Sequence, residues 1–144
     1  MLDGRSAMFE TKEQAKASDT YQQALKEKRF LDLLTERACD FTPRCYGLVI
    51  FKYNRNFRIG LILQHLGEKR MVDVKHEYRN DRGISIENRA DRISDLLYKR
   101  LEKKGIRHSD IHSRNIMYFQ KRFWVIDFSP SMIGEIVEKK EVQA

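Results

Sequence analysis

Long apolar segments are absent from this chain of 144 residues, whose longest unbroken apolar runs, such as Leu48-Val49-Ile50-Phe51, have only four residues. A helix needs about 20 apolar residues to cross a bilayer. The first residues, Met1 to Arg5, lack the apolar segment of a secretory signal. We therefore expect no membrane partner and no signal-directed secretion.

Cysteine, proline and glycine are also scarce, at 2, 2 and 7 residues. Cys39 and Cys45 are too few for a disulfide scaffold or a four-cysteine zinc site. We expect them to be reduced packing residues of a cytoplasmic or nuclear protein. No repeat divides the chain, which predicts a single domain, 1–144. The aromatic residues expected in its core are Tyr21, Phe30, Phe41, Phe57 and Trp124.

Charge of one sign is not concentrated anywhere, although 28 Lys and Arg residues outnumber 21 Asp and Glu residues and give a net charge of +7. The excess favours acidic or phosphate-bearing partners. Basic residues are interleaved with acidic ones and never form a run of five. We therefore expect a solvated surface and no specific nucleic-acid recognition.

The first half of the chain predicts helices followed by an antiparallel hairpin. Residues 10–38 contain neither Gly nor Pro and carry apolar residues at helical spacing, which fits one long helix or two shorter ones. Thr42-Pro43 ends that pattern. Tyr46–Phe51 and Phe57–Leu63 are predicted to be strands joined by the polar turn 52–56.

The second half predicts a surface segment, a helix and a second hairpin. The polar residues 73–81 are expected on the surface, and Ile86–Lys104 has the apolar spacing of an amphipathic helix. Asn115–Phe119 and Phe123–Asp127 are expected to be short paired strands, and the charged tail from Glu135 a frayed helix. The predicted fold class is α+β, with small antiparallel sheets packed on helices.

Three oxygen-bearing side chains follow the predicted helix: Asp110, Asn115 and Asp127. The two short strands can hold Asn115 and Asp127 near one another. A carboxylate and an amide oxygen are hard ligands that suit Mg²⁺, which keeps several waters and bridges to phosphate. Asp110 can then orient or deprotonate an attacking hydroxyl.

These residues resemble the catalytic core of the protein-kinase-like superfamily. His108-Ser109-Asp110 matches its His-x-Asp triplet, and Asn115 follows Asp110 at the spacing that this motif requires. Val125–Ser129 is similar to the metal-binding Asp-Phe-Gly segment, with serine in place of glycine. The resemblance implies ATP and Mg²⁺ as cofactors, Asp110 as catalytic base, and Asn115 and Asp127 as metal ligands.

The same resemblance implies a scaffold role for His108, which would hydrogen-bond backbone near the metal-binding segment. His112 is more like the aminoglycoside- and choline-kinase branch and certain small fungal kinase-like proteins. The segment Pro43–Gly47 also resembles the fungal group.

Upstream, the resemblance implies a nucleotide site. Leu63, Gln64 and Leu66 match the strand end and hinge that receive adenine through backbone groups, with Leu63 as gatekeeper and Leu66 as donor. Glu27 matches the helix glutamate that pairs with a phosphate-binding lysine.

The resemblance covers Glu27 to Ser129. It implies a protein-kinase-like core with a reduced N-lobe over residues 1–66, made of a helix and an antiparallel hairpin. Residues 67–144 would form the catalytic-loop part of a C-lobe.

The chain also departs from the kinase pattern. Its glycines do not form Gly-x-Gly-x-x-Gly, and the expected phosphate-binding lysine falls near Met8, with Lys12 and Lys16 as the nearest substitutes. Few residues follow Asp127, and no Ala-Pro-Glu segment is among them. The chain therefore resembles a kinase core shortened at both ends.

The leading hypothesis is an ATP-dependent phosphotransferase that moves a phosphoryl group, with Mg²⁺, to a hydroxyl of a protein or small molecule. The alternatives are a catalytically inactive pseudokinase or interaction module, favoured by the missing lysine and glycine loop, and a basic RNA-binding domain. A fourth hypothesis takes His108, Asp110 and His112 as the metal triad of a hydrolase. The RNA-binding patch would comprise Arg79, Arg82, Arg89, Arg92, Lys99 and Arg100.

Overall fold

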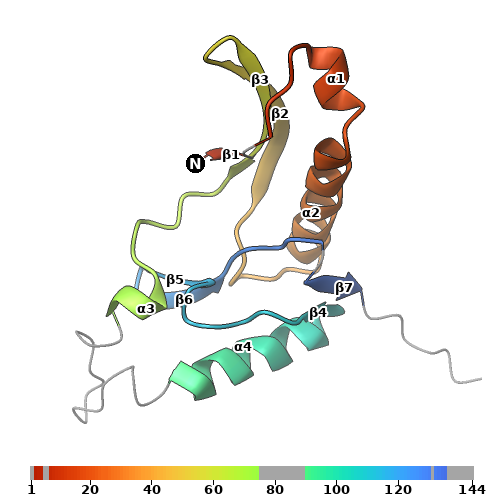
Figure 1. Ribbon diagram of the computed structural model, residues 1–144. Helices are drawn as coiled ribbons and strands as arrows, with labels where there is room; N and C mark the ends of the chain where they lie inside the picture. The colour runs from red at the N-terminus through yellow and green to blue at the C-terminus, as the bar shows by residue number, and fades with distance from the viewer. Residues whose placement is uncertain (1, 5–6, 75–89, 131, 136–144) are drawn as a thin grey trace, which may run out of the picture.

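The computed structural model describes residues 2–4, 7–74, 90–130 and 132–135, which form two packed parts (Figure 1). The N-terminal part contains three strands and two helices: β1 (Leu2–Gly4), α1 (Lys12–Lys16), α2 (Asp19–Glu36), β2 (Cys45–Tyr53) and β3 (Asn56–Leu63). The C-terminal part contains α3 (Met71–Val74), α4 (Ala90–Lys103), β4 (Ile106–His108), β5 (Ile116–Phe119), β6 (Arg122–Val125) and β7 (Ile133–Glu135). The fold class is therefore α+β, as predicted.

The region 10–38 forms two helices rather than one. The side chain of Thr11 accepts a hydrogen bond from the backbone N–H of Gln14, and Ser18 accepts one from Tyr21. Each bond satisfies a backbone donor that has no partner within the first turn of a helix. Because Ser18 caps a new helix, the chain starts α2 there instead of continuing α1.

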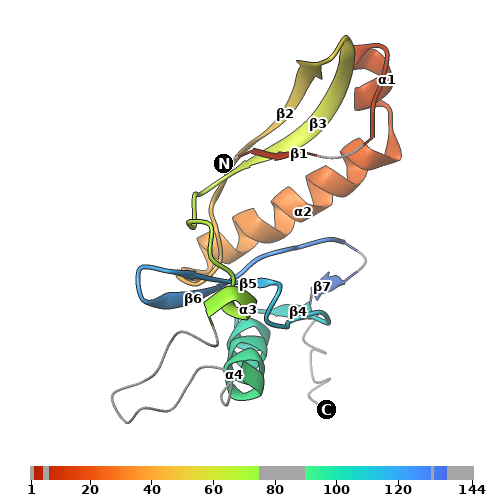
Figure 2. The same cartoon turned by 60° about the vertical axis from the view of Figure 1, so that its left-hand side comes forward.

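The predicted hairpin is confirmed, and it is longer than expected. The strands β2 and β3 pair up to Tyr53 and Asn56, so the turn is only Asn54-Arg55. Both turn residues have positive φ, 47° and 68°, which is the backbone that matches the twist of a two-residue hairpin. The strand β1, which the sequence analysis missed, pairs with the other edge of β3, so the sheet order is β1-β3-β2. Figure 2 shows α2 running along one face of this sheet.

The predicted amphipathic helix is α4, which begins at Ala90 within the described residues and ends at Lys103. Lys104 and Gly105 form the turn that follows it. Gly105 has φ 84°, a left-handed backbone conformation that glycine adopts without strain and that other residues rarely adopt.

The strand pair β4–β7 was not predicted, and the tail prediction is wrong at Glu135, which ends β7. The rest of that tail lies outside the described residues. The prediction of a surface segment from residue 73 holds for Asp73, which is exposed. However, Asp73 belongs to α3, whose residues Met71 and Val74 are buried, and residues 75–81 lie outside the described part.

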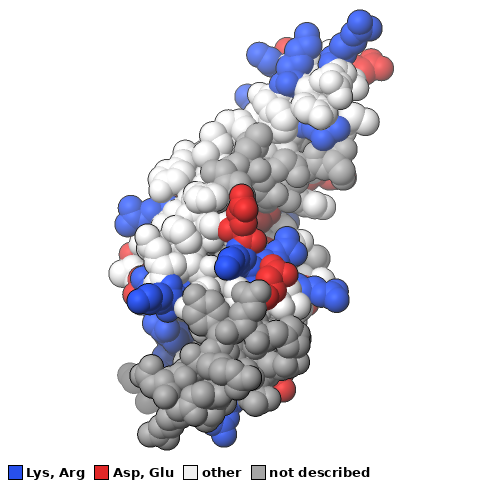
Figure 3. Space-filling view, turned by 90° about the vertical axis from the view of Figure 1, so that its left-hand side faces the viewer, with Lys and Arg blue, Asp and Glu red and all other residues white. Residues whose placement is uncertain are grey.

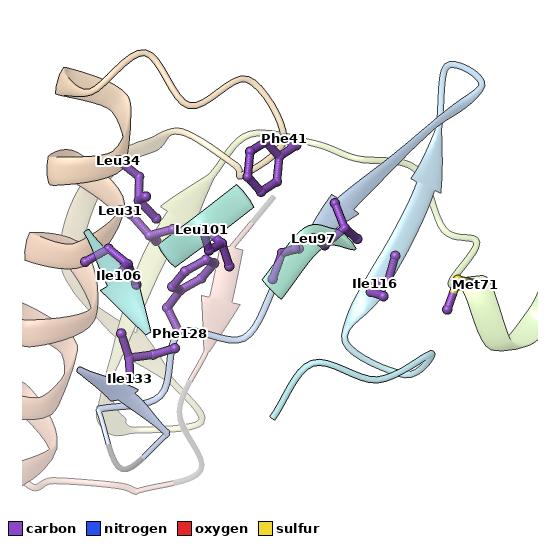
Figure 4. Packing of buried hydrophobic residues seen from close by; sticks show 11 residues of the cluster. Leu31, Leu34, Phe41, Met71, Leu97, Leu101, Ile106, Ile116, Phe128 and Ile133 are labelled. Carbon is purple, nitrogen blue, oxygen red and sulfur yellow. The ribbon is translucent and has the colours of Figure 1, made fainter. Parts of the chain in front are cut away.

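The main core joins the two parts of the molecule through α2 (Figure 4). Leu31 and Leu34 of α2 pack with residues of α4, β4, β5 and β7, whereas Ala24 packs under the three-stranded sheet with Ile59 and Leu61. The main core comprises Leu31, Leu34, Phe41, Met71, Leu97, Leu101, Ile106, Ile116, Val125, Phe128 and Ile133.

Of the aromatic residues expected in the core, Phe41 and Trp124 are buried, whereas Tyr21, Phe30 and Phe57 are only half-buried.

The two cysteines are free thiols that pack at the edges of the cores. Burial raises the pKa of the Cys45 thiol, which keeps it protonated and agrees with a packing role. Among the residues that the structure describes, no helix combines the length and apolar character that a membrane span needs.

Candidate functional site

A cavity of about 410 Å³ lies where the two parts of the molecule meet. This volume falls in the range typical of small-molecule sites, about 300–1,000 Å³. Its walls come from α2, the end of β3, the linker between β3 and α3 (residues 64–70), β5, and the segments on either side of the β5–β6 hairpin. The lining residues are Glu27, Leu31, Pro43, Leu63, Gln64, Leu66, Arg70, Arg114, Asn115, Met117, Ile126, Asp127 and Phe128.

Backbone hydrogen bonds hold the β3–α3 linker against β5, and α3 against the loop between β4 and β5 (residues 109–115, the β4–β5 loop). The N–H of Tyr118 donates to the oxygen of Lys69 at 2.8 Å, and the N–H of Val72 donates to the oxygen of Ser113 at 3.0 Å. These bonds explain why residues 64–70 share a cavity with residues more than forty positions further along the chain.

Glu27 is a buried carboxyl side chain on an otherwise apolar stripe of α2. The buried residues of α2 are Ala24, Glu27, Leu31 and Leu34, which recur at helical spacing. Glu27 is only 4% exposed and lines the cavity. A carboxylate is rarely buried at such a position without a partner. Along α2, Glu27 lies between Ala24, which belongs to the core under the sheet, and Leu31, which belongs to the main core.

Asp110 and Asn115 are joined directly. Nδ2 of Asn115 donates to the backbone oxygen of Asp110 at 2.9 Å and to its carboxylate oxygen Oδ2 at 3.1 Å. The amide is therefore oriented with its nitrogen toward Asp110, and its own oxygen Oδ1 is left to accept from or ligate another group. Asn115 is buried and lines the cavity, while Asp110 lies beside it, outside the cavity wall.

His108 fastens the β4–β5 loop to the segment after β6. Its Nδ1 accepts from the N–H of Asp110 at 3.0 Å, and its Nε2 donates to the backbone oxygen of Asp127 at 2.9 Å. The ring is 1% exposed and packs edge-on against Phe128, with centroids 5.4 Å apart. Burial lowers the pKa of His108, although hydrogen bonds to the backbone of Ile126 and Asp127 oppose that effect. The structure thus places His108 in the bonding pattern expected of a scaffold residue.

The prediction that Asn115 and Asp127 lie within the hairpin strands is wrong. β5 begins at Ile116 and β6 ends at Val125, although the N–H of Ile126 still donates to the oxygen of Asn115 at 2.9 Å. Asp127 leaves the strand conformation with φ 64°, a value that residues other than glycine seldom adopt. This turn lets the Asp127 backbone meet His108 while its side chain remains exposed at the cavity.

The three residues predicted to contact adenine all line the cavity. Leu63 is half-buried, and Leu66 is 2% exposed. Gln64 is fixed by a reciprocal pair of bonds, because its N–H donates to the oxygen of Arg44 at 2.8 Å and its side-chain oxygen accepts from the N–H of Arg44 at 3.2 Å. The linker therefore leaves the sheet at a defined point.

The proposed substitutes for the phosphate-binding lysine are in the wrong place. Lys12 is the first residue of α1 and Lys16 is the last. Nζ of Lys12 lies over the ring of Phe57, 6.0 Å from its centroid. Neither lines the cavity, whose cationic side chains are Arg70 and Arg114. Sequence analysis missed both arginines. Arg114 could have been found from its position next to Asn115, whereas nothing in the sequence marks Arg70.

The hydrolase hypothesis is wrong for His108, because both of its ring nitrogens are engaged with backbone groups and cannot bind a metal. Within the described residues no group of three or more His, Cys, Asp or Glu side chains is arranged to hold a metal ion. An Asn–Asp pair completed by phosphate oxygens and water is a different kind of site, which needs fewer protein ligands.

The basic residues expected to bind RNA do not form an unpaired basic patch within the part of the chain that the structure describes. Arg79, Arg82 and Arg89 lie outside the described part of the chain. On α4, Lys99 pairs with Asp95 at 3.1 Å, and Arg100 lies 3.7 Å from Asp40. Figure 3 shows basic and acidic side chains close together on one face, with basic ones gathered near the end that carries α1 and the β2–β3 turn.

No protein-family model matches this sequence, and a search of curated proteins finds no similar one. The function is therefore inferred from the cavity and the residues around it.

Proposed function

We propose that this chain binds ATP with Mg²⁺ in the cavity between its two parts and is a phosphotransferase of reduced protein-kinase-like fold. One observation carries the proposal. Six residues that the sequence predicts for the nucleotide and metal site come from three segments far apart in the chain, and all six line the same cavity. Asp110 accepts a hydrogen bond from one of the six, Asn115. The six that line it are Glu27, Leu63, Gln64, Leu66, Asn115 and Asp127.

The adenine would enter beside the β3–α3 linker. Leu63 and Leu66 supply apolar walls, and backbone groups of residues 64–66 supply hydrogen bonds to the ring edge. The reciprocal bonds between Gln64 and Arg44 fix this stretch of backbone before ligand arrives, which lowers the entropic cost of binding.

The phosphate end of the cavity fits a magnesium ion. Because the nitrogen of the Asn115 amide is committed to Asp110, its oxygen is available as a neutral ligand. Asp127 supplies a carboxylate at the same cavity. Mg²⁺ is commonly held by one or two protein oxygens plus nucleotide phosphates, and when bound it neutralises phosphate charge during transfer.

Arg70 and Arg114 would hold the phosphates in place of the missing lysine. Both residues line the same cavity as Asp127. A guanidinium remains charged at any working pH and can contact two phosphate oxygens at once. The absence of lysine from the described lining residues favours a second candidate, a nucleotide-binding pseudokinase.

Asp110 would act on the acceptor. As the acceptor oxygen forms its bond to the γ-phosphorus, the bond between that phosphorus and the bridging oxygen of ADP breaks. Asp110 takes the hydroxyl proton, and ADP leaves. Its hydrogen bond to Asn115 holds the base next to the group that would bind the metal.

The test is a calorimetric titration of ATP into the full chain with and without Mg²⁺, followed by an assay of phosphate transfer or hydrolysis. We expect Mg²⁺-dependent binding that Asp127→Asn removes. The matched control is Asp91→Asn, which changes an exposed carboxylate on α4. Binding without any transfer would select the pseudokinase. Failure of the wild-type protein to bind ATP would refute both candidates.

A further inference from the structure

His112 is held in a single orientation by the backbone of its own loop. The N–H of Arg114 donates to Nδ1 of His112 at 3.1 Å, and the N–H of Asn115 donates to the backbone oxygen of His112 at 2.9 Å. The first bond identifies the ring tautomer. A nitrogen that accepts a hydrogen bond carries no proton, so the proton of the neutral ring is on Nε2.

That proton faces Asp110. Nε2 of His112 lies 3.3 Å from Oδ1 of Asp110. It also lies 3.2 Å from Nδ2 of Asn115, but two donors cannot bond to each other, and the Asn115 nitrogen already donates to Asp110. The partner of the imidazole N–H is therefore the carboxylate.

Each oxygen of the Asp110 carboxylate thus meets a different donor. Oδ1 faces His112 Nε2, and Oδ2 accepts from Asn115 Nδ2 at 3.1 Å. The side chain of Asp110 is 37% exposed, so burial alone does not fix its rotamer. Two donors on opposite oxygens do fix it, and each oxygen retains a lone pair for an incoming hydroxyl.

We propose that His112 is a positioning residue that holds the Asp110 carboxylate in the orientation needed to accept a proton from the phosphate acceptor. This inference rests on the proposed function for its catalytic consequence, but the hydrogen bond itself does not.

The hydrogen bond is tested by NMR of the ¹⁵N-labelled imidazole rings, without any need for activity. The chain has 4 histidines, and the His112 signals are assigned by their loss in His112→Asn. We expect His112 to carry its proton on Nε2. We also expect Asp110→Ala to shift the His112 Nε2 signal while leaving that of the exposed His65 unchanged. A proton on Nδ1 of His112, or a His112 Nε2 chemical shift that is the same in the wild-type and Asp110→Ala chains, overturns the proposal.

The positioning role is tested by kinetics. His112→Ala should lower kcat by about tenfold, within the range expected when a catalytic group is misplaced, while KM for ATP changes by less than about twofold. His112→Gln, whose amide can donate to Asp110, should recover part of the loss. Equal loss in the two variants, or a change confined to KM, contradicts the role. A wild-type chain that neither binds nor turns over ATP instead refutes the proposed function, and the NMR result still decides the hydrogen bond.

Discussion

His108 donates a hydrogen bond of 2.9 Å from Nε2 to the backbone oxygen of Asp127. Because its Nδ1 accepts from the N–H of Asp110, a single buried ring sets the spacing between two segments that carry candidate catalytic groups. Both bonds exist together only while the ring is neutral. Protonation of Nδ1 would turn the acceptor into a donor facing a backbone N–H.

The first prediction concerns pH and stability. Burial lowers the pKa of His108 in the folded chain below its ordinary value, near 6.5. On acidification the unfolded chain therefore binds a proton before the folded chain does, and the free energy of unfolding falls as pH drops below about 6.5. Urea unfolding at a series of pH values measures this. His108→Asn should show a weaker pH dependence between about pH 7 and pH 5.5, whereas the control His65→Asn should keep the wild-type dependence. Identical profiles for all three proteins would contradict the assignment.

The second prediction separates phosphate binding from adenine binding. Arg70→Gln and Arg114→Gln should each weaken ATP binding by about tenfold, which is the usual effect of losing one charge-assisted contact. Adenosine has no phosphates, so its affinity should change little. The control is Arg92→Gln, on an exposed position of α4. An equal loss for ATP and adenosine would show that the arginines shape the cavity and do not bind phosphate.

The third prediction concerns the hairpin turn. Arg55 has φ 68° in a two-residue turn where glycine is the favoured second residue. Arg55→Gly should raise the free energy of unfolding by about 0.5–1 kcal/mol, because relief of the left-handed conformation exceeds the entropy that glycine adds to the unfolded chain. Lys52→Gly, within β2, should lower it by about the same amount. Denaturant midpoints for the two variants that move in the same direction would rule out this explanation.

Local patterns in the sequence predicted the hairpin and the amphipathic helix because their signals lie within one element. Helical spacing identified α4, and the run from Tyr46 to Leu63 identified β2 and β3. The pairing of β1 with β3 and of β4 with β7 joins residues far apart in sequence. Strands of three residues also carry too few side chains for a detectable alternation, so no local signal predicts them.

The same distinction applies to the site. The spacing of His108, Asp110 and Asn115 was visible because one short loop carries all three. The burial of Glu27 could have been predicted, since it falls on the stripe of Ala24 and Leu31. Arg70 reaches the cavity only because residues 69–72 bond to the backbone beside Asn115, a contact that no short pattern contains.

The last prediction concerns Asp127. Its backbone conformation favours glycine, whereas the proposed metal site needs its carboxylate. Its φ of 64° is accessible to glycine without strain and costs other residues roughly 1–2 kcal/mol, with Asp and Asn better suited to it than Ala. Asp127→Gly should therefore be more stable than Asp127→Ala by about 1 kcal/mol in urea unfolding. Both variants lack the carboxylate, so both should lose Mg²⁺-dependent ATP binding. Asp127→Ala should also impair activity more than Asn115→Ala or Asp110→Ala, because Asp127 is the one carboxylate assigned to the metal.

Comparing the glycine and alanine variants distinguishes a functional loss from a folding defect. If binding were lost only in the less stable alanine variant, Asp127 would have a structural role and the metal assignment would fail. The glycine variant could instead be at least as stable as the wild-type chain and yet bind no ATP with Mg²⁺. In that case the chain tolerates backbone strain at Asp127 because the carboxylate is needed at the cavity.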